Sequence, residues 1–295
     1  MKRLFLMLSV ALAAVACDYF GASKAIPLAE APERQGWTNF SGVSQMESNF
    51  FNFTLPALRG NVESVKICCN NGYYENDYLL FQFNQRGDVL EWGYYSGGYA
   101  LDKYVYSYNS QGLLESERSL GIFEGYAKHK YNNKNQRTQT IRYNSNNTVA
   151  SKENYAYDQA GNMIKSGNLT YGYDPNGNKI FCKSRGVICA TWVYDAQGRL
   201  IESTGDDGDY HFFKDVYAYD SSGRISKKDE YFKEDVAEPY TYSHTSKYEY
   251  DRFGNLVEER MSYASGETGK ISYRYDSQGN VVAKGDYTFE ITYRK

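Results

Sequence analysis

The chain has 295 residues, of which 33 are basic and 36 acidic, and its formal net charge is −3 at pH 7. This balance excludes the surplus of positive charge by which proteins bind nucleic acid or anionic lipid surfaces, so we expect neither partner. Tyrosine alone supplies 31 residues, and this amphipathic ring suits a half-wet β-sheet with a thin core.

The first 16 residues have the pattern of a secretory signal. Lys2 and Arg3 precede a mostly apolar block that ends in small residues before Cys17, and the block is too short for a spanning helix. The ending, residues 14–17 (AVAC), resembles a bacterial lipobox, which implies that Cys17 becomes the acylated first residue of the mature protein. The chain would then contact a membrane through acyl chains on Cys17. The alternative is that Cys17 is merely a small residue near an ordinary cleavage site.

Residues 17–49 are predicted to form a tether. They are polar, contain Pro27 and Pro32, and show no sustained hydrophobic period. As a coil of about 30 residues, this segment would hold the following domain roughly 30 Å from the bilayer. Asp18 resembles an inner-membrane retention signal of enteric lipoproteins, which other lineages need not obey. The expected localisation is therefore the bacterial cell envelope, with the inner or outer membrane left open.

Residues 50–295 are predicted to form one β-repeat domain, because ten copies of a short pattern recur there. Each copy has an aromatic anchor, then Asn or Asp, two variable positions, and Gly or Asn. The Asn or Asp side chain bonds the backbone two residues ahead, and Gly or Asn accepts a positive φ cheaply, so each copy predicts a turn closed by a left-handed residue. The anchors are Phe83, Tyr108, Tyr131, Tyr143, Tyr157, Tyr173, Tyr194, Tyr219, Tyr250 and Tyr275.

The residues on both sides of each turn indicate strands. Most copies have a second large ring two residues before the anchor and an apolar residue two positions beyond the Gly or Asn, as Tyr217 and Ile225 do around Tyr219. Alternation with period two predicts a strand, and strand, turn and strand make a β-hairpin. The anchors lie 12 to 31 residues apart, which leaves room for about two strands per unit, and the shortest intervals indicate abbreviated strands. The predicted fold is all-β, with antiparallel hairpin repeats in an elongated, strongly twisted sheet that can curl in part.

These units, with their recurring Tyr-Asp and the Gly three residues after the Asp, resemble the YD-repeat or Rhs family of bacterial and animal surface proteins. The match covers roughly residues 60 to 295. The resemblance implies hairpins laid side by side into a long sheet, which in large members spirals around a toxin or forms an adhesive body. This chain is far shorter and is more similar to small lipoprotein members, so we do not expect encapsulation.

Four cysteines follow Cys17 in a compartment that permits disulfides, namely Cys68, Cys69, Cys182 and Cys189, and they allow three pairings. If Arg185-Gly186 form a two-residue turn, Cys182 faces Cys189, so the spacing favours that bridge. A redox or metal site is the alternative, but the adjacent Cys68 and Cys69 would point to opposite faces of a strand and lack metal-site spacing.

We expect no metal, no cofactor and no enzymatic activity. His129, His211 and His244 stand in no metal-binding or catalytic pattern, and His129 occupies a ring position of the repeat, where packing is its expected role. The acidic run at 206–209 could suggest calcium, but it lacks the rest of an EF-hand loop, and an exposed hairpin turn explains it better.

The widest repeat interval, between Tyr219 and Tyr250, is the predicted contact surface, because long loops on rigid scaffolds are where binding tends to occur. Tyr231, Phe232 and Tyr240 are its candidate binding residues, and an ordinary long hairpin is the alternative. The predicted function is a lipid-anchored, non-catalytic binding module for a protein or a glycan. A structural envelope lipoprotein, or an immunity lipoprotein that neutralises a toxin, are the alternatives.

Overall fold

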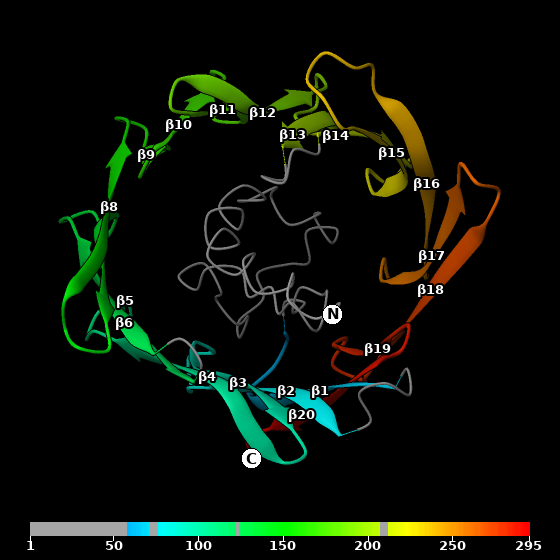
Figure 1. Cartoon of the computed structure of the whole chain (residues 1–295). Coiled ribbons are helices and arrows are strands. Elements are labelled where there is room, and N and C mark those ends of the chain that lie inside the picture. The colour runs from blue at the N-terminus through cyan, green and yellow to red at the C-terminus, as the bar shows by residue number, and fades with distance from the viewer. Residues whose placement is uncertain (1–57, 71–75, 122–123, 207–211) are drawn as a thin grey trace, which may run out of the picture. The chain divides into compact units, whose positions relative to one another are not determined.

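The computed structural model describes residues 58–70, 76–121, 124–206 and 212–295 (Figure 1). All regular secondary structure in these segments is β-strand, from β1 to β20, so the predicted all-β class is confirmed. Among the described residues, no helix is long and apolar enough to cross a membrane. The predicted signal, Cys17 and the tether lie outside the described residues.

The chain divides into two compact units, and one of them, the terminal unit, holds residues 58–167 together with Ser272–Lys295. Its strands are β1 (Val62–Cys69), β2 (Asp77–Phe83), β3 (Val89–Ser96), β4 (Tyr99–Tyr108), β5 (Leu114–Gly121), β6 (Gly125–Tyr131), β7 (Arg137–Asn144), β8 (Val149–Tyr157), β9 (Met163–Ser166), β19 (Val281–Lys284) and β20 (Tyr287–Tyr293). Strand β18 (Thr268–Tyr275) contributes its C-terminal part and pairs with β19. Strands β1 to β9 pair antiparallel in sequence order.

The other unit covers Asn168–Ile271 and is called the 168–271 unit. It holds β10 (Leu169–Tyr173), β11 (Lys179–Ser184), β12 (Val187–Tyr194), β13 (Leu200–Asp206), β14 (Phe212–Tyr219), β15 (Ile225–Lys233), β16 (Thr241–Tyr250) and β17 (Leu256–Tyr263). These strands also pair antiparallel with their sequence neighbours. The hairpin repeat is therefore the building principle of each unit.

All ten predicted turns are present and share one scheme of backbone hydrogen bonds. In the turn that begins at Asp220, the Asp220 amide donates to the Arg224 carbonyl, the Gly223 amide donates to the Asp220 carbonyl, and the Asp220 side chain accepts from the Ser222 and Arg224 amides. The closing residue has positive φ in every copy, from 59° at Asn135 to 90° at Gly161. The register shifts by one residue at the anchor in each hairpin, as between Ala218 and Tyr219. The turns are thus of the bulged, longer-loop kind that the pattern predicts.

The turn at Asn144 departs from the other nine in its place on the sheet. The turn at Asn132 joins β6 to β7, and the next one, at Asn144, joins β7 to β8, so these two turns lie at opposite ends of β7. This explains the interval of 12 residues between their anchors. The prediction of abbreviated strands is wrong here, because β7 and β8 have 8 and 9 residues. It is right for β9 and β10, with 4 and 5 residues.

The terminal strands pair with each other, which an elongated array in sequence order does not predict. Strand β20 pairs antiparallel with β1 from Val62 against Tyr293 to Cys69 against Tyr287, and Figure 1 shows the red β20 beside the cyan β1. The elongated-sheet prediction is corrected at this point, since β1 and β20 would otherwise be two edges. Edge strands offer unpaired amide and carbonyl groups to other chains, and this pairing satisfies them within the terminal unit.

The hydrophobic core lies in the terminal unit, around this pairing. Val65, Ile67, Phe81 and Phe289 are each at most 4 % exposed, and they pack with side chains of β2, β3, β4 and β5. Stacked rings extend the cluster, with centroids 4.6 Å apart for Trp92 and Tyr104. The terminal unit thus has a compact hydrophobic cluster in addition to its stacked rings. The thin core of tyrosines that the composition predicts therefore does not describe this unit.

The anchor tyrosines connect successive repeats through their hydroxyl groups. Five of the nine anchor tyrosines donate a hydroxyl hydrogen bond to the backbone carbonyl of the residue that begins the second strand of an earlier repeat. The bonds run from Tyr108 to Val89 (2.7 Å), Tyr131 to Leu114 (2.7 Å), Tyr157 to Arg137 (3.0 Å), Tyr219 to Leu200 (2.6 Å) and Tyr250 to Ile225 (2.7 Å). The tyrosine of the repeat is therefore a specific link between hairpins as well as a packing residue.

Candidate functional site: two faces of strands β13 to β17

The long interval between Tyr219 and Tyr250 forms an extended hairpin. Strands β15 and β16 have 9 and 10 residues, and residues 234–240 connect them. Tyr231 and Phe232 lie near the end of β15, and Tyr240 immediately precedes β16. The alternative interpretation, a long hairpin, is thus the structure of this interval, and the three predicted binding residues lie at one end of it.

These three residues do not form one surface. Tyr231 pairs with Lys214 and Phe232 pairs with Phe213 across β14, and adjacent residues of a strand point to opposite faces of a sheet. The side chain of Lys233 lies over the rings of both Phe212 and Tyr240, at 5.4 and 4.9 Å from the ring centroids. Since Lys233 is two residues from Tyr231, Tyr240 belongs with Tyr231, and Phe232 lies on the other side.

We call Phe212, Tyr231, Tyr240 and Tyr242 the aromatic face. The rings of Tyr231 and Tyr242 meet edge to face, with centroids 5.7 Å apart and an interplanar angle of 71°. The Tyr242 hydroxyl donates to Thr245 Oγ1 at 2.9 Å and to the Ser262 carbonyl at 3.2 Å, which fixes this ring although it is 36 % exposed. The rings are thus held in place while part of each remains accessible.

Charged side chains border the aromatic face in pairs. Lys214 Nζ lies 2.7 Å from Glu202 Oε2, and Lys227 Nζ lies 2.6 Å from Asp229 Oδ2. Burial acts to raise the pKa of Asp229, but hydrogen bonds from Lys227 and Thr245 outweigh it and lower that pKa. Burial raises the pKa of Tyr240, and the nearby Glu202 adds to this rise. The border therefore offers both donors and acceptors beside the rings.

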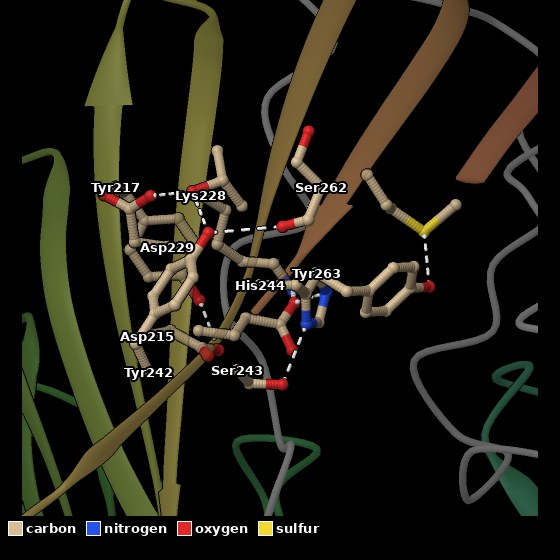
Figure 2. A network of polar contacts seen from close by, with 12 residues as sticks. Asp215, Tyr217, Lys228, Asp229, Tyr242, Ser243, His244, Ser262 and Tyr263 are labelled. Atoms are coloured by element: carbon tan, nitrogen blue, oxygen red, sulfur yellow. Dashed lines mark hydrogen bonds and ion pairs between the residues drawn. The ribbon is translucent and has the colours of Figure 1, made fainter. Parts of the chain in front are cut away.

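The opposite face of the same strands carries a row of polar residues in direct register. Ser203, Asp215, Glu230, His244 and Tyr263 face one another in turn across β13, β14, β15, β16 and β17. We call these five residues the polar row. Figure 2 labels three of its members, Asp215, His244 and Tyr263, together with Tyr217 and Lys228.

The members of the polar row are held by one another and by their neighbours. His244 Nε2 lies 3.3 Å from Glu230 Oε1, Lys228 forms an ion pair with the same oxygen, and His244 Nδ1 lies 3.1 Å from Ser243 Oγ (Figure 2). The Tyr217 hydroxyl donates to Asp215 Oδ2 at 3.1 Å.

Burial raises the pKa of Asp215, with a further contribution from Glu230, against the opposing effect of Lys228 and His244. Asp215 therefore takes up a proton at a higher pH than an ordinary aspartate does. Among the residues of the described segments, no cluster of three or more His, Cys, Asp or Glu side chains could hold a metal ion.

The sequence pattern did not reveal the polar row. Its members come from five strands, and β15 shifts register by one residue against β16 between Glu230 and Tyr231. A single signal was available, the Asp four residues before the anchor Tyr219, because eight of the other nine copies carry an uncharged residue at that position and only Glu153 is also acidic. The residues opposite Asp215 are set by the register between neighbouring strands, and the sequence of one repeat does not determine that register.

Cys182 and Cys189 lie close together, as the spacing predicts, but in a different register. Arg185 and Gly186 have φ of 51° and 87° and form the predicted two-residue turn. A bulge between Cys182 and Lys183 then places Cys182 opposite Ala190 in place of Cys189. The two sulfur atoms are 3.3 Å apart in this structure. The disulfide between them stays a prediction.

The other residues singled out in the sequence have local roles or lie outside the described residues. His129 is buried, its Nδ1 lies 2.9 Å from Thr140 Oγ1, and burial together with Arg137 and Arg142 lowers its pKa to about 3, so it stays neutral in packing. Cys69 lies in the hydrophobic core, while Cys68 Sγ lies 4.0 Å from Glu290 Oε1. His211 and three of the four residues in the acidic run at 206–209 are outside the described residues.

Comparison with known proteins identifies similar structures but no family. No family model and no curated protein matches the chain. A TcdB2-TccC3-Cdc42 crystal structure is similar at 16% identity and a TM-score of 0.41, over 70% of this chain and 12% of that chain. The Tc holotoxin pore of Photorhabdus luminescens is similar at 14% identity and a TM-score of 0.32, over 70% and 12%. A porin-like protein from Bacteroides uniformis is similar at 7% identity and a TM-score of 0.30, over 78% and 96%. This chain thus spans only 12% of the length of the Tc toxin chains it resembles.

Proposed function

We propose that this chain is a lipid-anchored bacterial envelope protein of the YD-repeat type, and that its β-domain binds a protein or a glycan without catalysing a reaction. The aromatic face is the observation that carries the proposal. Its four rings stand outside the anchor positions of the repeat, yet they gather on one side of the β15–β16 hairpin and are held there by Lys233 and Thr245. Aromatic side chains are enriched in binding interfaces because they bury a large area at a low cost in side-chain entropy.

The repeat itself supports a non-catalytic role. The recurrent Asn or Asp and the Gly or Asn are engaged in turn hydrogen bonds, and the anchor tyrosines link the hairpins. In the polar row, Glu230 is engaged by Lys228 and His244, and Asp215 by Tyr217. Groups committed to neighbours in this way stabilise the sheet, whereas a catalytic acid or base must reach a substrate atom.

The two-sided hairpin provides a matched test. Tyr231→Ala with Tyr240→Ala removes two rings from the aromatic face, and Phe232→Ala removes one from the opposite side of the same strand. With the mature chain immobilised and envelope extract as the source of ligand, we expect the double variant to lose capture of the partner and Phe232→Ala to retain it. Equal capture by all three proteins would place the interface elsewhere, and no selective capture by the wild type would favour the structural alternative.

Two further measurements address the anchor and the absence of catalysis. Cys17→Ser should release the protein from membranes into the soluble fraction, because no acylated cysteine remains; retention of this variant through a carbonate wash contradicts the anchor. Turnover of an envelope glycan or peptide by the wild type, abolished in Glu230→Gln, would overturn the non-catalytic proposal.

A further inference from the structure

A pocket of about 330 Å³ lies in the terminal unit, far in sequence from the aromatic face. It is lined by residues of β5 and β6 and by two residues of the turn after β7, Ser145 and Asn147. This is the turn at Asn144, the one that lies at the other end of its strand from the turn at Asn132. The volume is at the lower end for small-molecule sites, which are about 300 to 1,000 Å³, and suits one small ring better than a protein surface.

Two cations line the pocket. Arg118 on β5 and Lys128 on β6 are both exposed, and among the described residues neither takes part in an ion pair. Arg118 pairs with Tyr126 and Lys128 pairs with Ser116 across the two strands, which brings both cations onto one face. The single acidic residue of the lining is Glu124. The positive charge therefore exceeds the negative charge at this site, although the chain as a whole is acidic.

Hydrogen-bonding groups and a ring complete the lining. The side chains of Asn144, Asn146 and Thr148 bond among themselves within the turn. The side chains of Ser145 and Asn147 make no such bond among the described residues and border the pocket. Tyr126 stacks on the ring of Tyr143 with centroids 4.6 Å apart and planes 10° from parallel, so it presents a fixed apolar surface.

We propose that this pocket binds a small hydroxylated carboxylate of the sugar-acid class. The carboxylate would lie at Arg118 and Lys128, whose guanidinium and ammonium groups donate charge-assisted hydrogen bonds. The hydroxyl groups would bond Ser145, Asn147 and Glu124, and the apolar side of the ring would pack on Tyr126. The site is separate from the aromatic face and its occupancy does not depend on the function proposed for that face.

The test compares ligands that differ by one group. With the full chain in low salt, saturation-transfer NMR titrations would use D-glucuronate, D-glucose and acetate. We expect glucuronate to bind at least tenfold more tightly than either of the others, because glucose lacks the carboxylate and acetate lacks the hydroxyls. Equal binding of glucuronate and glucose, or of glucuronate and acetate, overturns the proposal. So does tighter binding of an acidic tripeptide, which would assign the pocket to a peptide carboxylate.

Variants locate the site. Arg118→Gln and Lys128→Gln should each weaken glucuronate binding at least fivefold, while Lys134→Gln should leave it unchanged, since the Lys134 side chain is exposed and lies in a different turn. Asn147→Gly keeps the left-handed position and removes only the side-chain amide, so it should weaken binding without lowering the melting temperature. Unaltered binding in both cation variants shows that glucuronate binds elsewhere and refutes the assignment.

Discussion

In eight of the ten turns, the side chains of the first residue and of the residue four positions later are complementary and bond each other. In seven of these eight turns, one side-chain oxygen of the first residue accepts from backbone amides, and the other polar atom of that side chain decides which residue can pair with it four positions later. Where that atom is the amide of Asn84, Asp88 accepts from it, and where it is the carboxylate of Asp251, Asn255 donates to it. The same rule holds for the pairs 132/136, 144/148, 158/162, 174/178, 195/199 and 220/224.

This rule predicts a double-mutant result. Asn255→Asp places two carboxylates face to face and should destabilise the protein by about 1 kcal/mol, because one hydrogen bond is replaced by a repulsion. Adding Asp251→Asn restores the arrangement seen at Asn84 and Asp88, and most of the stability should return. Urea unfolding of the wild type, both single variants and the double variant measures the coupling. Additive effects of the two substitutions would contradict the rule.

The aspartate turns should make stability depend on acid. The Asn162 side chain, with backbone amides, holds the pKa of Asp158 below its usual value, and Asn178 does the same for Asp174. A carboxyl group whose pKa is lower in the folded state stabilises fully above its unfolded pKa, and this contribution is lost as the pH falls through the folded pKa. Unfolding midpoints should therefore fall on acidification, and Asp158→Asn with Asp174→Asn should flatten that decline. An unchanged slope in the double variant would refute the assignment.

At the scale of strands and hairpins, tyrosine hydroxyls give five of the repeats a specific bond to an earlier one. The Tyr219 hydroxyl donates to the Leu200 carbonyl, and burial raises the pKa of Tyr219. Neighbouring hairpins are thus coupled through a side chain in addition to their strand ladders, which favours cooperative unfolding of adjacent repeats.

Tyr219→Phe should therefore destabilise the protein by about 1 kcal/mol, since the Leu200 carbonyl loses a partner while the ring is kept. Tyr99→Phe is the matched control, because Tyr99 is 77 % exposed and its hydroxyl bonds no described residue. Melting temperatures of the two variants give the comparison. If both variants have the melting temperature of the wild type, the hydrogen bond of the Tyr219 hydroxyl makes no measurable contribution to stability.

Local features of the hairpins could be predicted from the sequence, and long-range ones could not. The positive φ at Gly198 and Asn147 follows from residue type and the adjacent turn chemistry. The hydrogen-bond partner of the Tyr219 hydroxyl is a carbonyl 19 residues away in the sequence. Tyr231 and Phe232 are assigned to opposite faces of the sheet only once both are known to lie on β15. The pairing of Cys182 with Ala190 depends on a β-bulge that the sequence of the turn does not predict.

At the scale of the whole molecule, the pairing of β1 with β20 organises the hydrophobic core. Asn280 Nδ2 donates to the Arg59 carbonyl at 2.9 Å, and Arg294 Nη1 donates to the Val62 carbonyl at 2.7 Å. Phe289 on β20 is 4 % exposed among side chains of β1 to β5. Residues from the two ends of the described chain therefore share one core.

Phe289→Ala should consequently be far more destabilising than truncation of an exposed ring. We expect a loss of about 3 to 5 kcal/mol, the usual range for a buried phenylalanine, and less than about 0.5 kcal/mol for Phe232→Ala, whose ring is 43 % exposed. Chemical unfolding measures both, and hydrogen exchange should show lost protection in β1 as well as in β20. Protection that falls in β20 alone would show that the two strands are not coupled.

The same pairing sets the order in which the chain can fold. Hairpins such as β14–β15 close over short distances and can form early, but the contacts of Asn280 with Arg59 join residues 221 positions apart. Loop closure over that length is slow, so the edge of β1 opposite β2 stays unpaired, and Val65 and Ile67 lack their contact with Phe289, until residues 287–293 are in place. A chain stalled before that stage would expose the open edge of β1 to other chains, and its yield in the cell would depend on how long that interval lasts.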